Sequence, residues 1–223
     1  NLGVGLARLC LSAFARWEVD GRPAVPPHGP LLVVANHLSN ADPMVIAASV
    51  PRRARFLAKK ELFRGPLAPL FRAWGMHPLD RGGGDAGATR WALRTLEREQ
   101  ALVVFPEGTR SRGGGMGKAQ SGIAYLALRS QAPLLPIGIT GTERIPGIWR
   151  VAFPLCPIRV TIGQPFTLPP VEGRLDGGVL EAMTEVIMLH IAALLPPTYQ
   201  GVYAAVSRTP APVSPPPLPE VES

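Results

Sequence analysis

Cysteine is scarce in this 223-residue sequence, which contains only Cys10 and Cys156. Two cysteines cannot form a disulfide framework or a cysteine-rich zinc site, so the composition fits a reducing compartment. The histidines have neither the H-x-x-x-H spacing nor the cysteine neighbours of a zinc site; they are His28, His37, His77 and His190. We therefore expect no bound metal.

Several other signatures are missing. No apolar run reaches the roughly 18 to 20 residues that a membrane-spanning helix needs, and no G-x-S-x-G elbow marks a serine hydrolase. Aromatic residues make up only 6% of the chain, and no recognised nucleic-acid-binding module is present. Residues 113–118 have the wrong glycine spacing for a nucleotide-phosphate loop, and Ala119 stands where serine or threonine would bind magnesium. These absences argue against a membrane-spanning protein, a serine hydrolase with that elbow, a nucleic-acid-binding protein and a P-loop nucleotide-binding protein.

Positive charge is what the sequence has in excess, with 23 Lys and Arg against 16 Asp and Glu and a net charge of +7. The excess is concentrated in residues 50–81, which hold eight basic and two acidic side chains, whereas residues 171–223 hold two basic and six acidic ones. Basic clusters bind nucleic acid, anionic lipid headgroups or phosphorylated small molecules. Because no nucleic-acid module is present, we expect a membrane surface or a phosphorylated ligand and no nucleic-acid partner.

The two ends of the chain differ from its middle. In residues 1–24, apolar side chains recur at helical spacing from Leu2 to Trp17. Such a helix lies on a membrane interface or packs on the protein's own core, and the pattern does not distinguish the two. Residues 197–223 are rich in proline and alanine and are predicted to form a tail. The chain is 46% hydrophobic, enough for one folded domain over residues 25–196.

Strand-like and helix-like segments alternate between these ends. The predicted strands are 31–35, 55–58, 101–105, 134–140 and, at an edge, 159–162; the predicted helices are 43–50, 67–74, 86–100, 120–130 and 177–195. This alternation predicts an α/β fold: a mixed, largely parallel β-sheet flanked by helices, with an N-terminal amphipathic helical segment. In such a sheet, functional residues gather in loops beyond the carboxyl ends of the strands.

The loop after the strand at 31–35 carries His37 and, five residues later, Asp42. A histidine takes up a proton near neutral pH, and a carboxylate on one ring nitrogen leaves the other free as a base. The pair is therefore a candidate catalytic dyad. Asp42 followed by Pro43 is also a standard helix start, an N-cap aspartate before a proline, and the spacing by itself favours that structural role.

Two further features follow later strands. Residues 106–112 contain Glu107, Gly108 and Arg110, and arginine clamps phosphate while glycine lets the backbone approach a ligand closely. A charged surface turn would look the same. Pro136 lies within the predicted strand 134–140, where a proline predicts an edge or a bulge. Either arrangement would end strand pairing or shape a nearby site.

Residues 82–87 match the dinucleotide-binding spacing G-x-G-x-x-G, and a predicted helix follows them. A dinucleotide-binding oxidoreductase is therefore the alternative from a different reaction class, with Glu107 as the acidic residue twenty positions later. Residues 77–81 make a poor buried first strand, however, and Glu107 belongs to another loop. We favour a loop that happens to contain glycines.

Together these loops resemble the glycerolipid acyltransferase family, which includes bacterial 1-acylglycerol-3-phosphate acyltransferases. The resemblance covers roughly residues 25–165 and rests on four ordered blocks, each near a predicted strand end. The blocks are Asn36-His37 with Asp42, which matches the family's His-x4-Asp motif; Gly75 followed by Asp80-Arg81; residues 105–111, Phe-Pro-Glu-Gly-Thr-Arg-Ser; and residues 135–138, Leu-Pro-Ile-Gly. The second block departs from the bacterial pattern at His77 and Pro78.

The resemblance implies an O-acyltransferase of phospholipid biosynthesis that moves a fatty acyl group from acyl-CoA or acyl carrier protein to 1-acylglycerol 3-phosphate, or to another lysophospholipid, without a further cofactor. It implies that His37 is the catalytic base and Asp42 its partner. The implied substrate-binding residues are Lys59, Lys60, Arg81, Glu107, Gly108, Thr109, Arg110 and Pro136. Neighbouring strand side chains face opposite ways, so the sequence leaves open which lysine faces the site. We expect the enzyme at the cytoplasmic face of a membrane, as a peripheral or monotopic protein.

Overall fold

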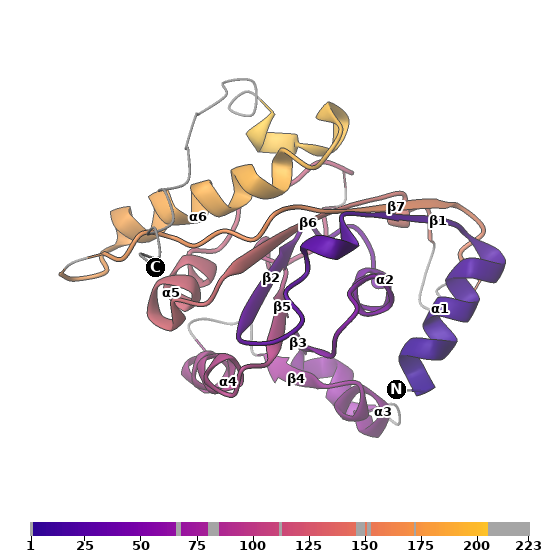
Figure 1. Ribbon diagram of the computed structural model, residues 1–223, viewed down its shortest axis with the longest axis horizontal. Helices are drawn as coiled ribbons and strands as arrows, with labels where there is room; N and C mark the ends of the chain where they lie inside the picture. The colour runs from indigo at the N-terminus through magenta and orange to yellow at the C-terminus, as the bar shows by residue number, and fades with distance from the viewer. Residues whose placement is uncertain are drawn as a thin grey trace, which may run out of the picture.

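The computed structural model describes residues 2–65, 68–79, 85–111, 113–145, 150, 153–171 and 173–204. In these residues a seven-stranded sheet of order β1-β7-β6-β2-β5-β3-β4 lies between two layers of helices (Figure 1). Neighbouring strands are parallel except for the antiparallel pair β6 and β7. The α/β class and the largely parallel sheet predicted from the sequence are confirmed.

The element bounds are close to those predicted. The strands are β1 (Arg16–Asp20), β2 (Leu31–Ala35), β3 (Ala54–Lys59), β4 (Met76–Leu79), β5 (Ala101–Val104), β6 (Leu134–Thr140) and β7 (Pro157–Ile162). The α-helices are α1 (Leu2–Phe14), α2 (Asp42–Ser49), α3 (Ala68–Ala73), α4 (Ala86–Glu97), α5 (Gly122–Ser130) and α6 (Gly177–Ala192). Short 3-10 helices are η1 (Arg22–Ala24), η2 (Lys60–Arg64), η3 (Thr142–Arg144), η5 (Pro197–Tyr199) and η6 (Gly201–Tyr203). Each predicted strand and helix is present.

The central strand β2 joins the two halves of the core. All five of its side chains are buried, as expected for a parallel sheet that is covered on both faces. Leu31, Val33 and Ala35 belong to the apolar cluster that includes α1 and α2. Leu32 and Val34 belong to the cluster formed with α4, α5 and α6. Burial on both faces therefore holds the loop after β2 at the middle of the sheet edge.

Two strands, β1 and β4, were not predicted. β1 pairs in parallel along β7, so β7 is an interior strand and its predicted edge position is wrong. Helix α1 ends at Phe14, and Trp17, which the periodic pattern placed on the helix, lies in β1. β4 is the opposite edge of the sheet and is half-buried, a setting in which Pro78 is tolerated because one side of the strand has no ladder partner.

Pro136 lies in the interior strand β6, at an interruption in its pairing with β7. The ladder runs from Thr140 to Ile137, and the next paired residues, Leu134 and Phe166, are offset by one residue. Gly163 N donates to the Pro136 carbonyl at 2.9 Å, while proline has no N–H to return. The predicted bulge is therefore confirmed, and the predicted edge is not.

Helix α1 packs on the protein's own core along one side and exposes apolar side chains along the other. Ala7 and Leu11 are buried in the core, whereas Leu6 is 59% and Leu9 is 64% exposed. Among the described residues, no helix has both the length and the apolar character required to cross a membrane. Residues 1–24, predicted as a separate segment, thus include a strand of the main sheet.

The start of the predicted tail is folded. Helices η5 and η6 follow α6, and Tyr203 is buried against the rest of the protein. The remainder of the predicted tail, residues 205–223, lies outside the described residues.

Candidate active site

Four parallel strands bring their following loops to one edge of the sheet. His37 follows β2, Glu107 follows β5, Lys59 ends β3 and Thr142 follows β6. Chain segments about 100 residues apart therefore lie next to one another. This placement agrees with the expectation that functional residues gather beyond the carboxyl ends of the strands.

His37 and Asp42 form a buried pair. His37 Nδ1 lies 2.8 Å from Asp42 Oδ2, which also accepts hydrogen bonds of 2.7 Å from the backbone N–H groups of Leu38 and Ser39. The other oxygen, Oδ1, accepts from the Thr142 hydroxyl at 2.6 Å. The fully buried carboxylate is therefore held on both oxygens. It keeps the ring proton of His37 on Nδ1 and leaves Nε2 as the free base nitrogen.

A helix does begin at Asp42 and Pro43, as the sequence predicts, but Asp42 is not its N-cap residue. The residue at the N-cap of α2 is Ala41, and no side chain caps the helix. Asp42 lies in the first turn and accepts from the loop amides before it, not from the amides of α2. The helix dipole still favours a negative charge at this position. The fold thus supplies the pairing with His37 that the spacing alone did not favour.

Glu107 holds the backbone of His37. Its Oε1 accepts from His37 N at 3.1 Å, and its Oε2 accepts from Gly117 N at 2.7 Å and from the Ser111 hydroxyl. Ser111 N in turn donates to the His37 carbonyl at 2.8 Å. Glu107 is 5% exposed, and both of its oxygens are occupied by protein groups. We predicted a substrate contact for this residue, but the geometry fits a role in positioning His37.

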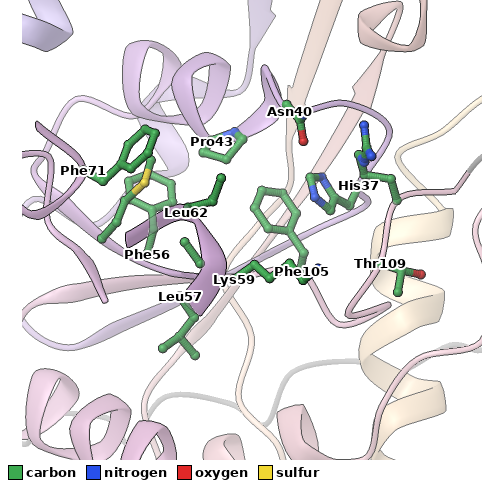
Figure 2. A pocket seen from close by; sticks show the side chains of 13 residues that line it. His37, Asn40, Pro43, Phe56, Leu57, Lys59, Leu62, Phe71, Phe105 and Thr109 are labelled. Carbon is green, nitrogen blue, oxygen red and sulfur yellow. The ribbon is translucent and has the colours of Figure 1, made fainter. Parts of the chain in front are cut away.

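A cavity of about 620 Å³ opens beside His37. The imidazole stacks on the Phe105 ring with the centroids 4.2 Å apart. Figure 2 shows these two rings side by side, with Phe56, Leu62 and Phe71 farther from His37. The polar lining residues are Asn40, Lys59, Thr109 and Arg110, and the remaining apolar ones are Pro43, Leu57, Ala58 and Met76. The cavity is therefore lined by the imidazole of His37, by two cationic side chains and by an apolar wall.

The structure brings together only some of the predicted substrate-binding residues. Lys59, Thr109 and Arg110 line the cavity with His37, whereas Lys60 begins η2 and is not among the lining residues. Gly108 lines a neighbouring cavity of about 510 Å³ at the start of α5. Pro136 packs toward Gly163, near Leu194, on the α6 side of the sheet. Arg81 lies outside the described residues.

Three residues that build the site were given no role from the sequence: Thr142, which it did not single out, and Phe105 and Asn36, which it noted only as members of motif blocks. Thr142 donates to Asp42, and Phe105 supplies the ring against which His37 stacks. Asn36 is fully buried and joins β2 to β6, accepting from Ile139 N at 2.8 Å and donating to the Ile139 carbonyl at 2.9 Å. Thr142 follows the carboxyl end of a strand, which is the signal that could have identified it.

The alternative sites considered from the sequence can be compared with the described residues. A strand, β4, does precede the glycine-containing segment and α4 follows it, but β4 is a half-buried edge strand and not a buried central one. No cluster of three or more histidine, cysteine or acidic side chains suitable for a metal occurs in the described part of the chain. Asp85 of the glycine-containing segment caps α4 by accepting from Ala88 N at 2.9 Å. Residues 82–84 lie outside the described residues. Glu107, the acidic residue that a dinucleotide site would need, accepts a hydrogen bond from the backbone N–H of His37.

Comparison with known proteins gives one consistent result. The acyltransferase family model matches residues 16–140. A 1-acyl-sn-glycerol-3-phosphate acyltransferase from Limnanthes douglasii is 32% identical over 146 residues, covering 63% of this chain and 50% of the relative. The human 1-acyl-sn-glycerol-3-phosphate acyltransferase alpha is 35% identical over 127 residues, covering 55% and 44%. The chain thus spans about half the length of these curated relatives.

A solved structure extends the similarity to most of the fold. The crystal structure of the 1-acyl-sn-glycerophosphate (LPA) acyltransferase PlsC from Thermotoga maritima aligns with a TM-score of 0.65 at 26% sequence identity. The alignment covers 83% of this chain and 76% of that one. Because the family model covers more than half of the chain and includes His37, Asp42 and the residues around Glu107, this protein belongs to the acyltransferase family.

Proposed function

We propose that this chain transfers a fatty acyl group from acyl-CoA or acyl carrier protein to the free hydroxyl of 1-acylglycerol 3-phosphate, giving phosphatidic acid. The observation that carries the proposal is the His37–Asp42 pair, whose free ring nitrogen borders a cavity with cationic and apolar walls. The names of the relatives and of the solved structure support this acceptor.

The proposed chemistry is a direct transfer. His37 Nε2 removes the proton of the acceptor hydroxyl as the oxygen attacks the thioester carbonyl carbon. The new C–O ester bond forms, the C–S bond breaks, and the departing sulfur takes the proton from His37. A thioester is already activated, so no acyl-enzyme is needed. Much of the rate then comes from holding the two substrates in the correct orientation.

The cationic residues of the cavity are suited to the acceptor's phosphate. Arg110 follows β5 and Lys59 ends β3, and both line the cavity that contains His37. Both side chains are exposed and therefore reach solvent as well as the cavity. Arginine binds phosphate bidentately, whereas lysine acts as a point charge. Phe56, Leu62 and Phe71 supply the apolar surface for an acyl chain.

Replacement of Arg110 tests the phosphate contact. We expect Arg110→Gln to raise the KM for 1-acylglycerol 3-phosphate by at least ~10-fold, because a hydrogen bond to a charged group is worth about 1.5–3 kcal/mol. Arg129→Gln on α5 removes an exposed arginine away from the cavity and serves as the control. Steady-state kinetics with varied acceptor give the result. An unchanged KM in Arg110→Gln would remove this residue from the phosphate site.

A substrate panel tests the function itself. The purified protein is offered 1-acylglycerol 3-phosphate, glycerol 3-phosphate or lysophosphatidylcholine, first with acyl-CoA and then with acyl carrier protein as the donor. We expect the highest kcat/KM with 1-acylglycerol 3-phosphate. Preference for lysophosphatidylcholine would identify the acceptor as another lysophospholipid. Thiol release without any acceptor would instead identify a thioesterase and contradict the proposal.

We also propose that α1 helps to dock the protein on a membrane. Leu6, Leu9 and Phe14 are exposed on α1, and Phe14 contacts Phe153 in an edge-to-face arrangement with the ring centroids 4.8 Å apart. Leu155 N donates to the Phe14 carbonyl at 2.9 Å, and Leu155 is 63% exposed. These side chains form an apolar surface that suits a lipid interface, where both long-chain substrates reside.

Substitution of two leucines tests the docking surface without removing β1 from the sheet. We expect Leu6→Ser with Leu9→Ser to lower partitioning onto anionic phospholipid vesicles at least ~10-fold, since burying a leucine side chain is worth about 1.5–3 kcal/mol. Val186→Ser on α6, on the other side of the sheet, is the control. Vesicle co-sedimentation measures the change. Equal partitioning of the double variant and wild type would exclude α1 from docking.

A further inference from the structure

The segment after α6 returns to the active-site edge of the sheet. Residues 197–203, which we call the C-terminal strap, form η5 and η6 and appear as yellow turns beyond the end of α6 in Figure 1. Gln200 Nε2 attaches the strap to the end of α6 and the turn after it, donating to the carbonyl groups of Ala192 at 3.1 Å and Leu195 at 3.0 Å. The strap is therefore anchored at one side to a helix of the core.

The strap holds the loop that supports Glu107. Met116 N donates to the Tyr199 carbonyl at 2.9 Å, and Val202 N donates to the Met116 carbonyl at 3.1 Å, so Met116 is held through both backbone groups. The next residue, Gly117, donates its N–H to Glu107 Oε2, and Glu107 Oε1 accepts from His37 N. The backbone of His37 is thus connected to the strap through Glu107 and the loop around Met116.

Two further contacts fix the same loop. Ala119 N donates to the Tyr203 hydroxyl oxygen at 3.3 Å. Gly201 has φ of +55°, and a Cβ atom there would lie 2.1 Å from the Met116 carbonyl oxygen and 2.4 Å from its nitrogen. A side chain at this position would push the strap away from the loop. The close contact therefore requires glycine at position 201.

The strap also reaches the turn that supports Asp42. The Tyr199 hydroxyl donates to Glu143 Oε1 at 2.9 Å, and the preceding residue, Thr142, donates to Asp42 Oδ1. Burial and the hydrogen bond to Glu143 raise the pKa of Tyr199, so its hydroxyl remains protonated near neutral pH. One short segment consequently touches both loops on which the dyad depends.

We propose that the C-terminal strap positions the dyad: Tyr199 and Tyr203 hold the loops of Glu107 and Thr142 so that His37 Nε2 stays aimed into the cavity. The strap lies beyond residues 16–140, the part of the chain that the family model matches. The expected effect on kcat rests on the proposed function. The tautomer of the His37 ring can be measured whether or not the protein transfers acyl groups. Loosening the strap lowers the fraction of molecules with a correctly oriented base, and therefore lowers kcat more than it raises KM.

The double variant Tyr199→Phe with Tyr203→Phe removes both hydroxyls and keeps both rings. Each lost hydrogen bond weakens the hold on one loop, and we expect a kcat about tenfold lower with a KM for 1-acylglycerol 3-phosphate within about twofold of wild type. Tyr125→Phe removes the hydroxyl of a half-buried tyrosine on α5 and is the control. Gly201→Ala is the second test variant and displaces the strap by the clash with Met116.

The second measurement is the ¹⁵N spectrum of histidine-labelled protein, with the His37 signals assigned from their loss in His37→Gln. In wild type we expect a protonated Nδ1 and an unprotonated Nε2, because Asp42 holds one tautomer. In the double variant the two shifts should move toward each other. Unchanged kcat in both test variants, or lowered kcat with unchanged His37 shifts, would overturn the positioning role. If wild type transfers no acyl group, the proposed function fails and the His37 shifts alone decide the role of the strap.

Discussion

His37→Ala is expected to lower turnover by at least ~10²-fold while acceptor binding is largely retained, because the substitution removes the base but leaves Lys59 and Arg110 in place. The reason is local: in the proposed reaction the free ring nitrogen beside the cavity takes the hydroxyl proton. Steady-state kcat and KM for both substrates measure the effect, and the thermal unfolding midpoint shows whether the fold is kept.

His28→Ala provides the matched control for this experiment. His28 is exposed in the segment before β2, on the side of the protein where Arg52 donates to its backbone carbonyl, and its side chain can be removed without touching the cavity. We expect wild-type turnover from it. If His37→Ala also retained near-normal acyl transfer, His37 would not be the base, and the role of the dyad would have to be abandoned.

Asp42→Asn is expected to have the second large effect, a loss of about 10²- to 10⁴-fold in kcat, because an amide cannot hold the same tautomer of His37. The replacement should also destabilise the folded state. The native carboxylate accepts from Thr142, from the His37 ring and from two loop amides, and an asparagine has one acceptor oxygen for them. Each buried donor left without a partner costs about 1–3 kcal/mol, so the unfolding midpoint should fall as well.

Asp176→Asn separates these effects from a general loss of carboxylate charge. Asp176 caps α6 by accepting from Val179 N at 2.9 Å, and asparagine is an equally good N-cap residue. We expect little change in its kcat or unfolding midpoint. Denaturant unfolding together with steady-state kinetics gives both numbers for each variant. Wild-type kcat in Asp42→Asn would show that the aspartate has only a structural role.

The interior of the fold could be predicted from the sequence because its strands are apolar on both faces. β2 and β6 are almost entirely buried, and α4 has a buried apolar face at helical spacing. β1 and β4 were missed because both are short and only partly buried, and each becomes a strand through pairing with a neighbour far along the chain. Such tertiary pairing leaves little trace in a local pattern.

The same distinction applies to the site. His37 and Asp42 are only five residues apart, and the family resemblance predicted the pair where the spacing alone favoured a helix cap. Thr142 contacts Asp42 from 100 residues away, and the contact exists only because β6 lies next to β2 in the sheet. The sequence also left open which of the two lysines faces the cavity. In the structure, Lys59 at the end of β3 lines the cavity and Lys60 does not.

For Glu107, the fold favours a different role from the substrate contact that the motif predicts. The motif placed a carboxylate beside an arginine, as an acceptor site would need, but only the fold shows that both carboxylate oxygens are bonded within the protein. Buried polar groups are almost always paired, so a buried carboxylate next to several backbone amides is expected to be occupied by them. The neighbouring exposed Arg110 is the residue that remains available to a ligand.

A single-turnover experiment tests direct transfer by the His37–Asp42 pair more directly than any other measurement. Enzyme in excess over acyl-CoA is mixed with or without 1-acylglycerol 3-phosphate, and free thiol, phosphatidic acid and acylated protein are quantified together. Direct transfer predicts one phosphatidic acid for each thiol released, no thiol release without acceptor, and neither product from His37→Gln. Thiol release or acylated protein in the absence of acceptor would contradict it.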